Sequence, residues 1–211
     1  MNQDHPEVIE LWNLVFIQYN RKADGSLEEL PEKHIDTGMG FERLARIVQN
    51  KKSNYDTDIF TSLINEISKI TGIKYGNDIE SDIAFRVIAD HVRAVSFCIA
   101  DGQIPGNNGS SYVIRRILRR AIRYGYQFLE FKEPFIHQLV PILVHNFEGV
   151  FEDIVTRKEF IIKIIKEEET SFFRTLSEGI KKMQQIVSYQ LKSKNNLISG
   201  QLAFELYDRY G

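Results

Sequence analysis

The pattern of apolar and polar positions changes once along the chain, close to residue 40. Residues 12–19 are rich in β-branched and aromatic side chains, which is typical of a strand. A polar connection over 21–33 contains Pro31, and extended character resumes at 34–37. From Phe41 onward the apolar positions recur at the spacing of a helix. The first part of the chain is therefore predicted to hold two strands, and almost everything after it to be helical.

Capping residues and breakers divide the helical part into segments. Asp56 and Asp58 indicate the start of one helix, and Gly72 indicates its end. The later helices are expected at about 83–100, 112–126, 134–147, 152–191 and 201–207. The predicted fold class is mainly α, with a small antiparallel β segment in residues 1–50 and an all-helical domain in 51–211. Two strands alone are only marginally stable in water, so the β segment is expected to pack on the helices or to belong to a larger sheet.

Composition is ordinary for a globular protein. An apolar fraction of 43% and a charged fraction of 27% in 211 residues disfavour disorder and permit a buried core. The single cysteine, Cys98, lies in an apolar run, where an inert thiol is expected rather than a nucleophile. No stretch approaches the roughly 18 apolar residues of a membrane span, so we expect a cytoplasmic protein with no membrane partner.

Charge is unevenly distributed, although 27 basic and 29 acidic side chains sum to a net charge of −2. The segment 103–129 has no acidic residue, and helical spacing gathers its five arginines on the arc opposite its apolar positions. These arginines are Arg115, Arg116, Arg119, Arg120 and Arg123. A uniformly positive face favours a nucleic acid, because the guanidinium fork suits phosphate oxygens. An internal network with the acidic run at 167–169 is the alternative, and mixed roles stay open.

A glycine-rich turn joins the second strand to the first helix, with the sequence Asp-Thr-Gly-Met-Gly-Phe-Glu-Arg at 36–43. Two glycines allow a sharp bend close to a ligand, and Arg43 in the first helical turn could face a phosphate. On the strands, alternation gives faces that could hold a small amino acid, with Asp36 for its ammonium and with Val15 and Gly38 limiting side-chain volume. Asn13 shares the face of Val15. The competing interpretation is a structural turn, with Arg43 paired to a surface carboxylate.

Several sequence blocks occur together, and in order, in one family. The blocks are 12–21, 36–44, 53–56, 89–93, 112–123, 167–176 and 206–211. On these blocks the chain resembles the alanyl-tRNA synthetases, which are class II aminoacyl-tRNA synthetases. The resemblance spans almost the whole chain. It implies that residues 1–50 are the C-terminal part of a class II catalytic domain and that 51–211 are a tRNA-recognition domain.

The resemblance also implies roles for the turn and its strands. The turn is similar to class II motif 3, in which Arg43, with Gly38 and Gly40, would contact ATP. The residues matching Asn13, Val15, Asp36 and Gly38 line the alanine pocket of the family, with Asp36 on the α-amino group. Arg43 and Asp36 are therefore the catalytic candidates. ATP and Mg²⁺ are implied for the intact enzyme.

In the helical domain, the resemblance assigns RNA contacts. The residues matching Asn107 and Asp208 flank a G·U pair in the acceptor stem of the alanine tRNA, and the arginine helix would bind the same RNA. One departure occurs at Ser110 and Ser111, where the family usually has Arg-Gly, so the choice of Asn107 over Asn108 stays open.

The first two class II motifs have no match in this sequence. The chain is therefore expected to be a fragment that works with the remaining domains of the same synthetase, and to be inactive alone. No zinc is expected, because the five histidines show no ligand spacing with cysteine. A non-catalytic RNA-binding module is one alternative. The other is a protein-interaction module with a helical seam, formed by Leu176, Ile180, Met183 and Val187.

Overall fold

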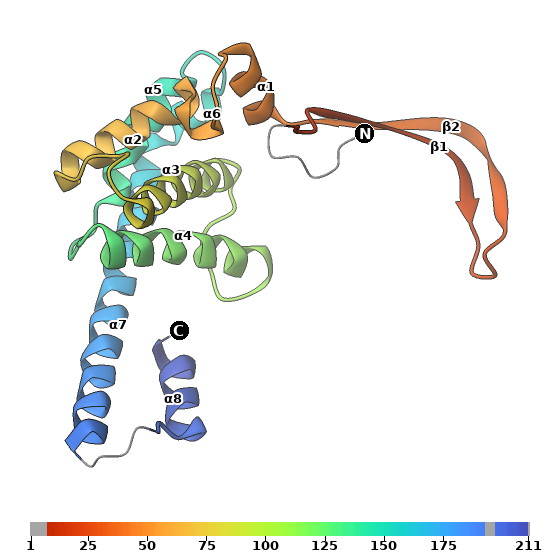
Figure 1. Cartoon of the computed structure of the whole chain (residues 1–211). Helices are drawn as coiled ribbons and strands as arrows, with labels where there is room; N and C mark the ends of the chain where they lie inside the picture. Colours follow the sequence, from red (N-terminus) through yellow and green to blue (C-terminus); the bar gives the residue numbers. More distant parts are fainter. Residues whose placement is uncertain (1–7, 193–196, 211) are drawn as a thin grey trace. The chain divides into compact units, whose positions relative to one another are not determined.

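The computed structural model describes residues 8–192 and 197–210, without the side chains at 192 and 207–209. The chain divides into two compact units, Met1–Thr61 and Ser62–Gly211. The described residues form two antiparallel strands followed by helices, which confirms the predicted fold class (Figure 1). No helix in the described ranges is long and apolar enough to cross a membrane.

The first unit contains a long hairpin of β1 (Trp12–Arg21) and β2 (Leu27–Met39), joined by a turn at Gly25 with φ +85°. The second strand is much longer than the predicted 34–37. Pro31 lies inside it, but the ladder shifts register between the pairs Ile17↔His34 and Tyr19↔Glu29. Proline has no N–H to donate and is tolerated at such an irregularity, so it does not end the strand.

After the hairpin come α1 (Phe41–Val48) and the 3-10 turn η1 (Asn54–Asp56). Helix α2 (Asp58–Thr71) begins in the first unit and continues into the second. It ends as predicted at Gly72, which has φ +72°. The predicted apolar stripe of α2 is buried at Ile59, Leu63, Ile64 and Ile67.

The second unit is helical and closes on a core of its own. Its elements are α3 (Ile79–Ala100), α4 (Gly109–Phe128), η2 (Ile136–Leu139), α5 (Val140–Phe147), α6 (Glu152–Thr156), α7 (Lys158–Lys192) and α8 (Gly200–Tyr210). Helices α3 and α4 pack closely along their lengths (Figure 1). Fully buried residues from several elements, including Phe85, Leu118, Phe135 and Ile165, form the core.

Several helix boundaries differ from the prediction: α4 begins at Gly109 rather than near residue 112, and the helix expected over 134–147 is η2 followed by α5. Helix α3 starts at Ile79 rather than near residue 83, because Asp78 caps it by accepting a hydrogen bond from the Ser81 N–H at 2.9 Å. The predicted helix over 152–191 is two helices, α6 and α7, which are separated at Arg157. Cys98 is half-buried, and burial raises the pKa of its thiol, with a smaller contribution from Asp101.

Candidate functional site

The hairpin register brings the four predicted amino-acid-binding residues onto one face. Asn13 is paired with Gly38, and Val15 is paired with Asp36. Residues directly opposite in an antiparallel ladder project to the same side, as do residues two apart on one strand. The face therefore presents an amide, a small apolar side chain, a carboxylate and a glycine in one compact block across the two strands.

Two contacts fix the chemistry of this face. The Gly38 N–H donates to Asn13 Oδ1 at 2.9 Å, which leaves the amide Nδ2 of Asn13 as an outward donor. A Cβ at Gly38 would lie 3.3 Å from Asn13 Oδ1, so a larger residue would push the amide aside. Among the described residues Asp36 has no hydrogen-bond or ion-pair partner, so its carboxylate is available for a ligand.

The glycine-rich turn continues from this face into α1. The Gly40 N–H donates to the Leu11 carbonyl at 2.9 Å, which ties the turn to the start of β1. Arg43 folds back along the turn, and its Nη1 donates to the Glu10 carbonyl at 2.6 Å. A Cβ at Gly40 would lie 3.2 Å from Arg43 Cδ. Arg43 thus bonds to a neutral carbonyl rather than to the surface carboxylate of the competing interpretation, and its positive charge is left for an anion.

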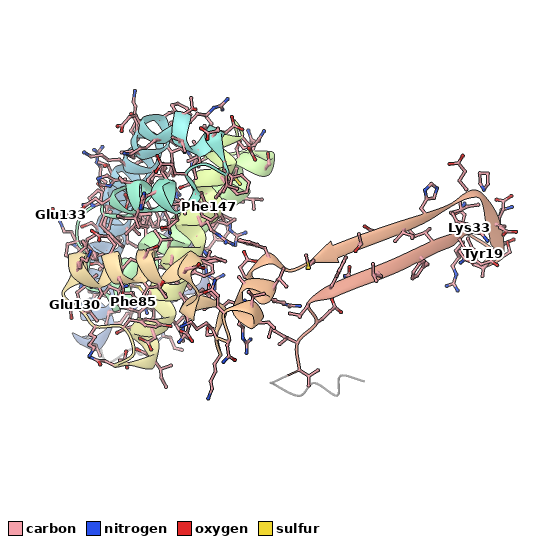
Figure 2. All side chains as sticks on the ribbon, turned by 90° about the horizontal axis from the view of Figure 1, so that it is seen from above. Tyr19, Lys33, Phe85, Glu130, Glu133 and Phe147 are labelled. Carbon is pink, nitrogen blue, oxygen red and sulfur yellow. The ribbon has the colours of Figure 1, made fainter. Side chains whose placement is uncertain are left out.

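The opposite face of the hairpin is apolar and exposed. Trp12, Phe16 and Ile35 are among its large side chains, and Trp12 Nε1 donates to Thr37 Oγ1. Figure 2 shows hairpin side chains, including Tyr19 and Lys33, projecting outward from the ribbon. Within the described residues the sheet has only two strands. An apolar sheet face of this kind is typical of a surface that packs against further structure.

On α4, two of the five arginines share one carboxylate of α7. Arg115 Nη2 donates to Glu168 Oε2 at 3.0 Å, and Arg119 Nε donates to Glu168 Oε1 at 3.1 Å. Arg115 Nε also lies 2.9 Å from Oε1, but its N–H makes no hydrogen bond there, so the Nη2 bond defines the pair. The Glu168 side chain is only 10% exposed. The prediction of a uniformly positive face is therefore wrong for Arg115 and Arg119, because both pair with one distant carboxylate, which offsets one of their two positive charges.

The other three arginines of α4 are exposed and stack on tyrosines. The guanidinium of Arg116 lies 5.8 Å from the ring centroid of Tyr112. Those of Arg120 and Arg123 lie 5.7 and 5.8 Å from the ring of Tyr124. No carboxylate pairs with these three among the described side chains, and stacking leaves the guanidinium N–H groups free to donate. We call Arg116, Arg120 and Arg123 the outer arginines.

The loop before α4 holds Asn107 beside the paired arginines. Asn107 Oδ1 accepts a hydrogen bond from Arg115 Nη1, whereas Asn108 is the N-cap of α4 and makes no side-chain cap bond. The Gly106 N–H donates to the Ser111 carbonyl at 2.9 Å, and Ser110 Oγ donates to Gln103 Oε1 at 3.1 Å. The two serines that depart from the family pattern thus close the loop. The side chain of Asp208 lies outside the described residues.

The sequence blocks imply a particular order of elements for part of a class II synthetase. The structure has this order: a hairpin leads through a glycine turn into a helix, and a helical unit with exposed arginines follows. A family model for tRNA synthetases class II (A) matches residues 1–211. The chain therefore belongs to the class II (A) tRNA synthetase family.

Curated relatives carry the same identification. The chain is 58% identical to an alanine–tRNA ligase of Cytophaga hutchinsonii and 59% identical to one of Christiangramia forsetii. It is 53% identical to the alanine–tRNA ligase of Bacteroides thetaiotaomicron. Each match covers 100% of this chain and 24% of the relative, so the chain spans about a quarter of the length of these proteins. These findings confirm the family resemblance and do not favour the alternative of a protein-interaction module.

Two features of the site were not predicted from the sequence: which acidic residue pairs with α4, and the stacking of the outer arginines on tyrosines. Glu168 is predicted only as one of three consecutive acidic residues, and nothing local shows which of them reaches α4. Tyr112 and Tyr124 lie four positions before Arg116 and four after Arg120, a spacing that places side chains together on a helix and could have indicated the stacking. The expected absence of zinc stays a prediction.

Proposed function

We propose that this chain is part of an enzyme that activates alanine with ATP and transfers it to the alanine tRNA. The observation that carries the proposal is the cross-strand block of Asn13, Val15, Asp36 and Gly38, beside a turn that holds Arg43. We assign residues 1–50 to the C-terminal part of the catalytic domain and 51–211 to tRNA recognition.

On the hairpin face, each side chain has a role that its chemistry suits. The carboxylate of Asp36 would accept hydrogen bonds from the alanine ammonium, and the free Nδ2 of Asn13 would donate to an acceptor atom of the substrate. Val15 and Gly38 would bound the space for the methyl group. Such a pocket separates small side chains by only about 1–3 kcal/mol.

Arg43 would bind the ATP phosphates, with Gly38 and Gly40 allowing close approach of the backbone. Mg²⁺ accompanying ATP would neutralise phosphate charge when bound, and we assign no residue of this chain to it. The adenylation step is electrostatic and positional: the substrate carboxylate attacks the α-phosphorus, the bond to pyrophosphate breaks, and Arg43 stabilises charge on the leaving pyrophosphate.

The amino-acid site is tested in the intact enzyme by Asp36→Asn. Loss of a charge-assisted interaction of about 1.5–3 kcal/mol should raise the KM for alanine about 10- to 100-fold in alanine-dependent ATP–pyrophosphate exchange. Asp24→Asn is the matched control, because Asp24 lies in the same hairpin but accepts hydrogen bonds from Ser26. An unchanged KM for Asp36→Asn would contradict the assignment.

We infer that the 211-residue chain does not catalyse adenylation alone. The first turn of α1 supplies one arginine proposed to bind phosphate, Arg43, and the apolar face of the hairpin has no further strand within the described residues. Pyrophosphate exchange by the isolated chain should therefore stay at background. Robust turnover would show that the site is complete in this chain.

For RNA, we propose that the outer arginines contact phosphates of the acceptor stem. They are exposed, stacked and without a carboxylate partner among the described side chains, whereas Arg115 and Arg119 are already paired with Glu168. Asn107, and in the family pattern Asp208, would read the G·U pair.

Charge reversal tests the RNA surface. Arg120→Glu with Arg123→Glu should weaken binding of an acceptor-stem hairpin and lower the salt slope by about 1 per lost phosphate contact. Lys163→Glu with Lys166→Glu on α7 is the control for net charge, since it reverses the same number of charges at two residues that are exposed on a different helix. Equal losses from reversal on either helix would mean that the outer arginines form no specific contact.

A further inference from the structure

A hydrogen-bond network, which we call the polar network, joins the loop before α4 to the middle of α7. It consists of Asn107, Arg115, Glu168 and Arg119. Its members lie 8, 53 and 49 positions apart along the sequence, counted between bonded partners. The Arg115 side chain is 20% exposed, and that of Arg119 is 34% exposed, so the pairing is shielded from much of the solvent. Breaking a shielded, hydrogen-bonded charge pair costs more free energy than breaking an exposed one, because removing either partner leaves the other charge unpaired.

The bond from Arg115 to Asn107, at one end of the polar network, fixes which way the Asn107 amide faces. A guanidinium has five donors and no acceptor, so Arg115 can bond only to the amide oxygen of Asn107. The oxygen therefore faces Arg115, and the Nδ2 donor is left to face a ligand. A free amide could turn over and offer oxygen instead, which would present the opposite hydrogen-bonding character to a base edge.

Glu168 in turn fixes Arg115. Its two oxygens accept from Arg115 Nη2 and Arg119 Nε, and Arg119 also packs over the Phe172 ring with 5.0 Å to the centroid. The carboxylate thus holds the guanidinium of Arg115 in the orientation that lets Nη1 reach Asn107. Without it, Arg115 would be free to turn to phosphate.

We propose that Arg115 and Glu168 are positioning residues that lock the Asn107 amide with its donor toward the RNA. This inference rests on the proposed role of Asn107 in acceptor-stem recognition. It gives the five arginines of α4 different roles, since the outer arginines provide affinity for phosphate and Arg115, held by Glu168, provides base discrimination.

The test measures binding of the 211-residue chain to two acceptor-stem RNA hairpins, one with the G·U pair and one with G·C in its place. The readout is the ratio of the two dissociation constants. Glu168→Gln and Arg115→Lys should each reduce this ratio about fivefold or more, while affinity for the G·C hairpin changes less than about twofold. Lysine keeps the charge but offers one ammonium, which cannot hold the amide and both carboxylate contacts together.

The matched control is Glu167→Gln, the same substitution at the exposed neighbouring position, which should leave the ratio unchanged. Asn107→Ala should reduce the ratio at least as much as Glu168→Gln, and adding Glu168→Gln to it should reduce the ratio no further, because both act through one amide. Thermal melting checks that each variant is folded, and Arg115→Lys is the deciding variant if Glu168→Gln unfolds.

The outcomes separate the two proposals. If Asn107→Ala loses discrimination while folded Arg115→Lys and Glu168→Gln keep it, the positioning inference is wrong and the RNA proposal stands. Equal loss of affinity for both hairpins would reduce Arg115 and Glu168 to a structural role and also overturn the inference. If Asn107→Ala has no effect on the ratio, the proposed recognition of the G·U pair by Asn107 is wrong, and the positioning inference that rests on it is wrong as well.

Discussion

The hairpin and the helical unit bury their apolar side chains to very different extents. Leu14 on β1 is 57% exposed, whereas Leu118 on α4 is fully buried. Figure 2 shows Phe85 among the side chains of the helical unit and hairpin side chains standing clear of the ribbon. The helical unit carries its own core, while the hairpin presents apolar residues with no cover among the described residues. The same residue type is therefore structural in one region and a contact surface in the other.

This difference bears on function. A two-stranded sheet with an exposed apolar face needs further strands or another packed layer to become rigid. The residues proposed to bind substrate lie on the other face and are ordered relative to each other by the cross-strand register. A catalytic site needs positions held to a fraction of an ångström. The proposed RNA surface lies on helices with a completed core and needs no such addition.

The largest contrast is expected from one substitution made in both regions. Leu118→Ala should lower the free energy of unfolding by about 2–5 kcal/mol, because it leaves a cavity in the core. Leu14→Ala in the same chain should change it by less than about 0.5 kcal/mol, because its side chain is exposed. Denaturant unfolding followed by circular dichroism measures both. Similar losses of stability at the two leucines would contradict the distinction between a packed helical core and an uncovered hairpin face.

A second large effect is expected at Glu169, a fully buried carboxylate on α7. Its Oε1 accepts from the N–H groups of Phe135 and Ile136 at 3.1 and 2.9 Å, and its Oε2 accepts from the His137 N–H at 3.1 Å and lies 3.0 Å from His137 Nδ1. Glu169→Gln replaces one acceptor oxygen by a donor that faces an N–H group.

We expect Glu169→Gln to destabilise the helical unit by about 3 kcal/mol, since hydrogen bonds to a buried charge are lost. The same unfolding experiment tests this value. Glu167→Gln, two positions earlier and exposed, should change stability by less than about 0.5 kcal/mol. A neutral result at Glu169 would mean that this carboxylate does not hold η2 against α7.

A smaller effect is expected at Gly125 on α4. A Cβ there would lie 2.7 Å from Phe135 Cε1, and that ring is buried and stacked on Phe131 at 3.9 Å between centroids. Gly125→Ala gains about 1 kcal/mol of helix propensity but overpacks the core by about 1–3 kcal/mol. We expect a net loss of stability of up to about 2 kcal/mol, measured by thermal melting of the chain.

Gly200→Ala is the comparison for this prediction, because no atom lies within 4 Å of its added Cβ. It should be neutral or slightly stabilising. Stabilisation of similar size at both glycines would show that the Phe135 ring moves aside and that the core tolerates more volume than its packing indicates.

Local rules predict much of the fold and the hairpin site. Alternation correctly separates the faces of β1, and Gly72 correctly ends α2, because both depend on residues close in sequence. The prediction shortens β2 because Pro31 is a breaker by local rules, whereas the register shift accommodates it. No proline or glycine lies near Arg157, so the break between α6 and α7 has no local signal.

The arginine helix shows the limit of prediction from sequence. Amphipathic spacing places the five arginines on the polar arc, but their division into paired and outer arginines depends on a carboxylate about 50 positions away, Glu168. Contacts between distant helices arise from packing of the whole unit, and spacing within α4 carries no information about them.

Hydrogen exchange of the 211-residue chain, with and without an acceptor-stem hairpin of the alanine tRNA, shows directly whether the helical unit recognises RNA. RNA should slow amide exchange at the loop before α4 and along the first turns of α4, and leave β1 and β2 unchanged. A mutant with Arg120→Glu and Arg123→Glu should lose this protection. Protection confined to the hairpin, or none anywhere at saturating RNA, would contradict the assignment of RNA recognition to the helical unit.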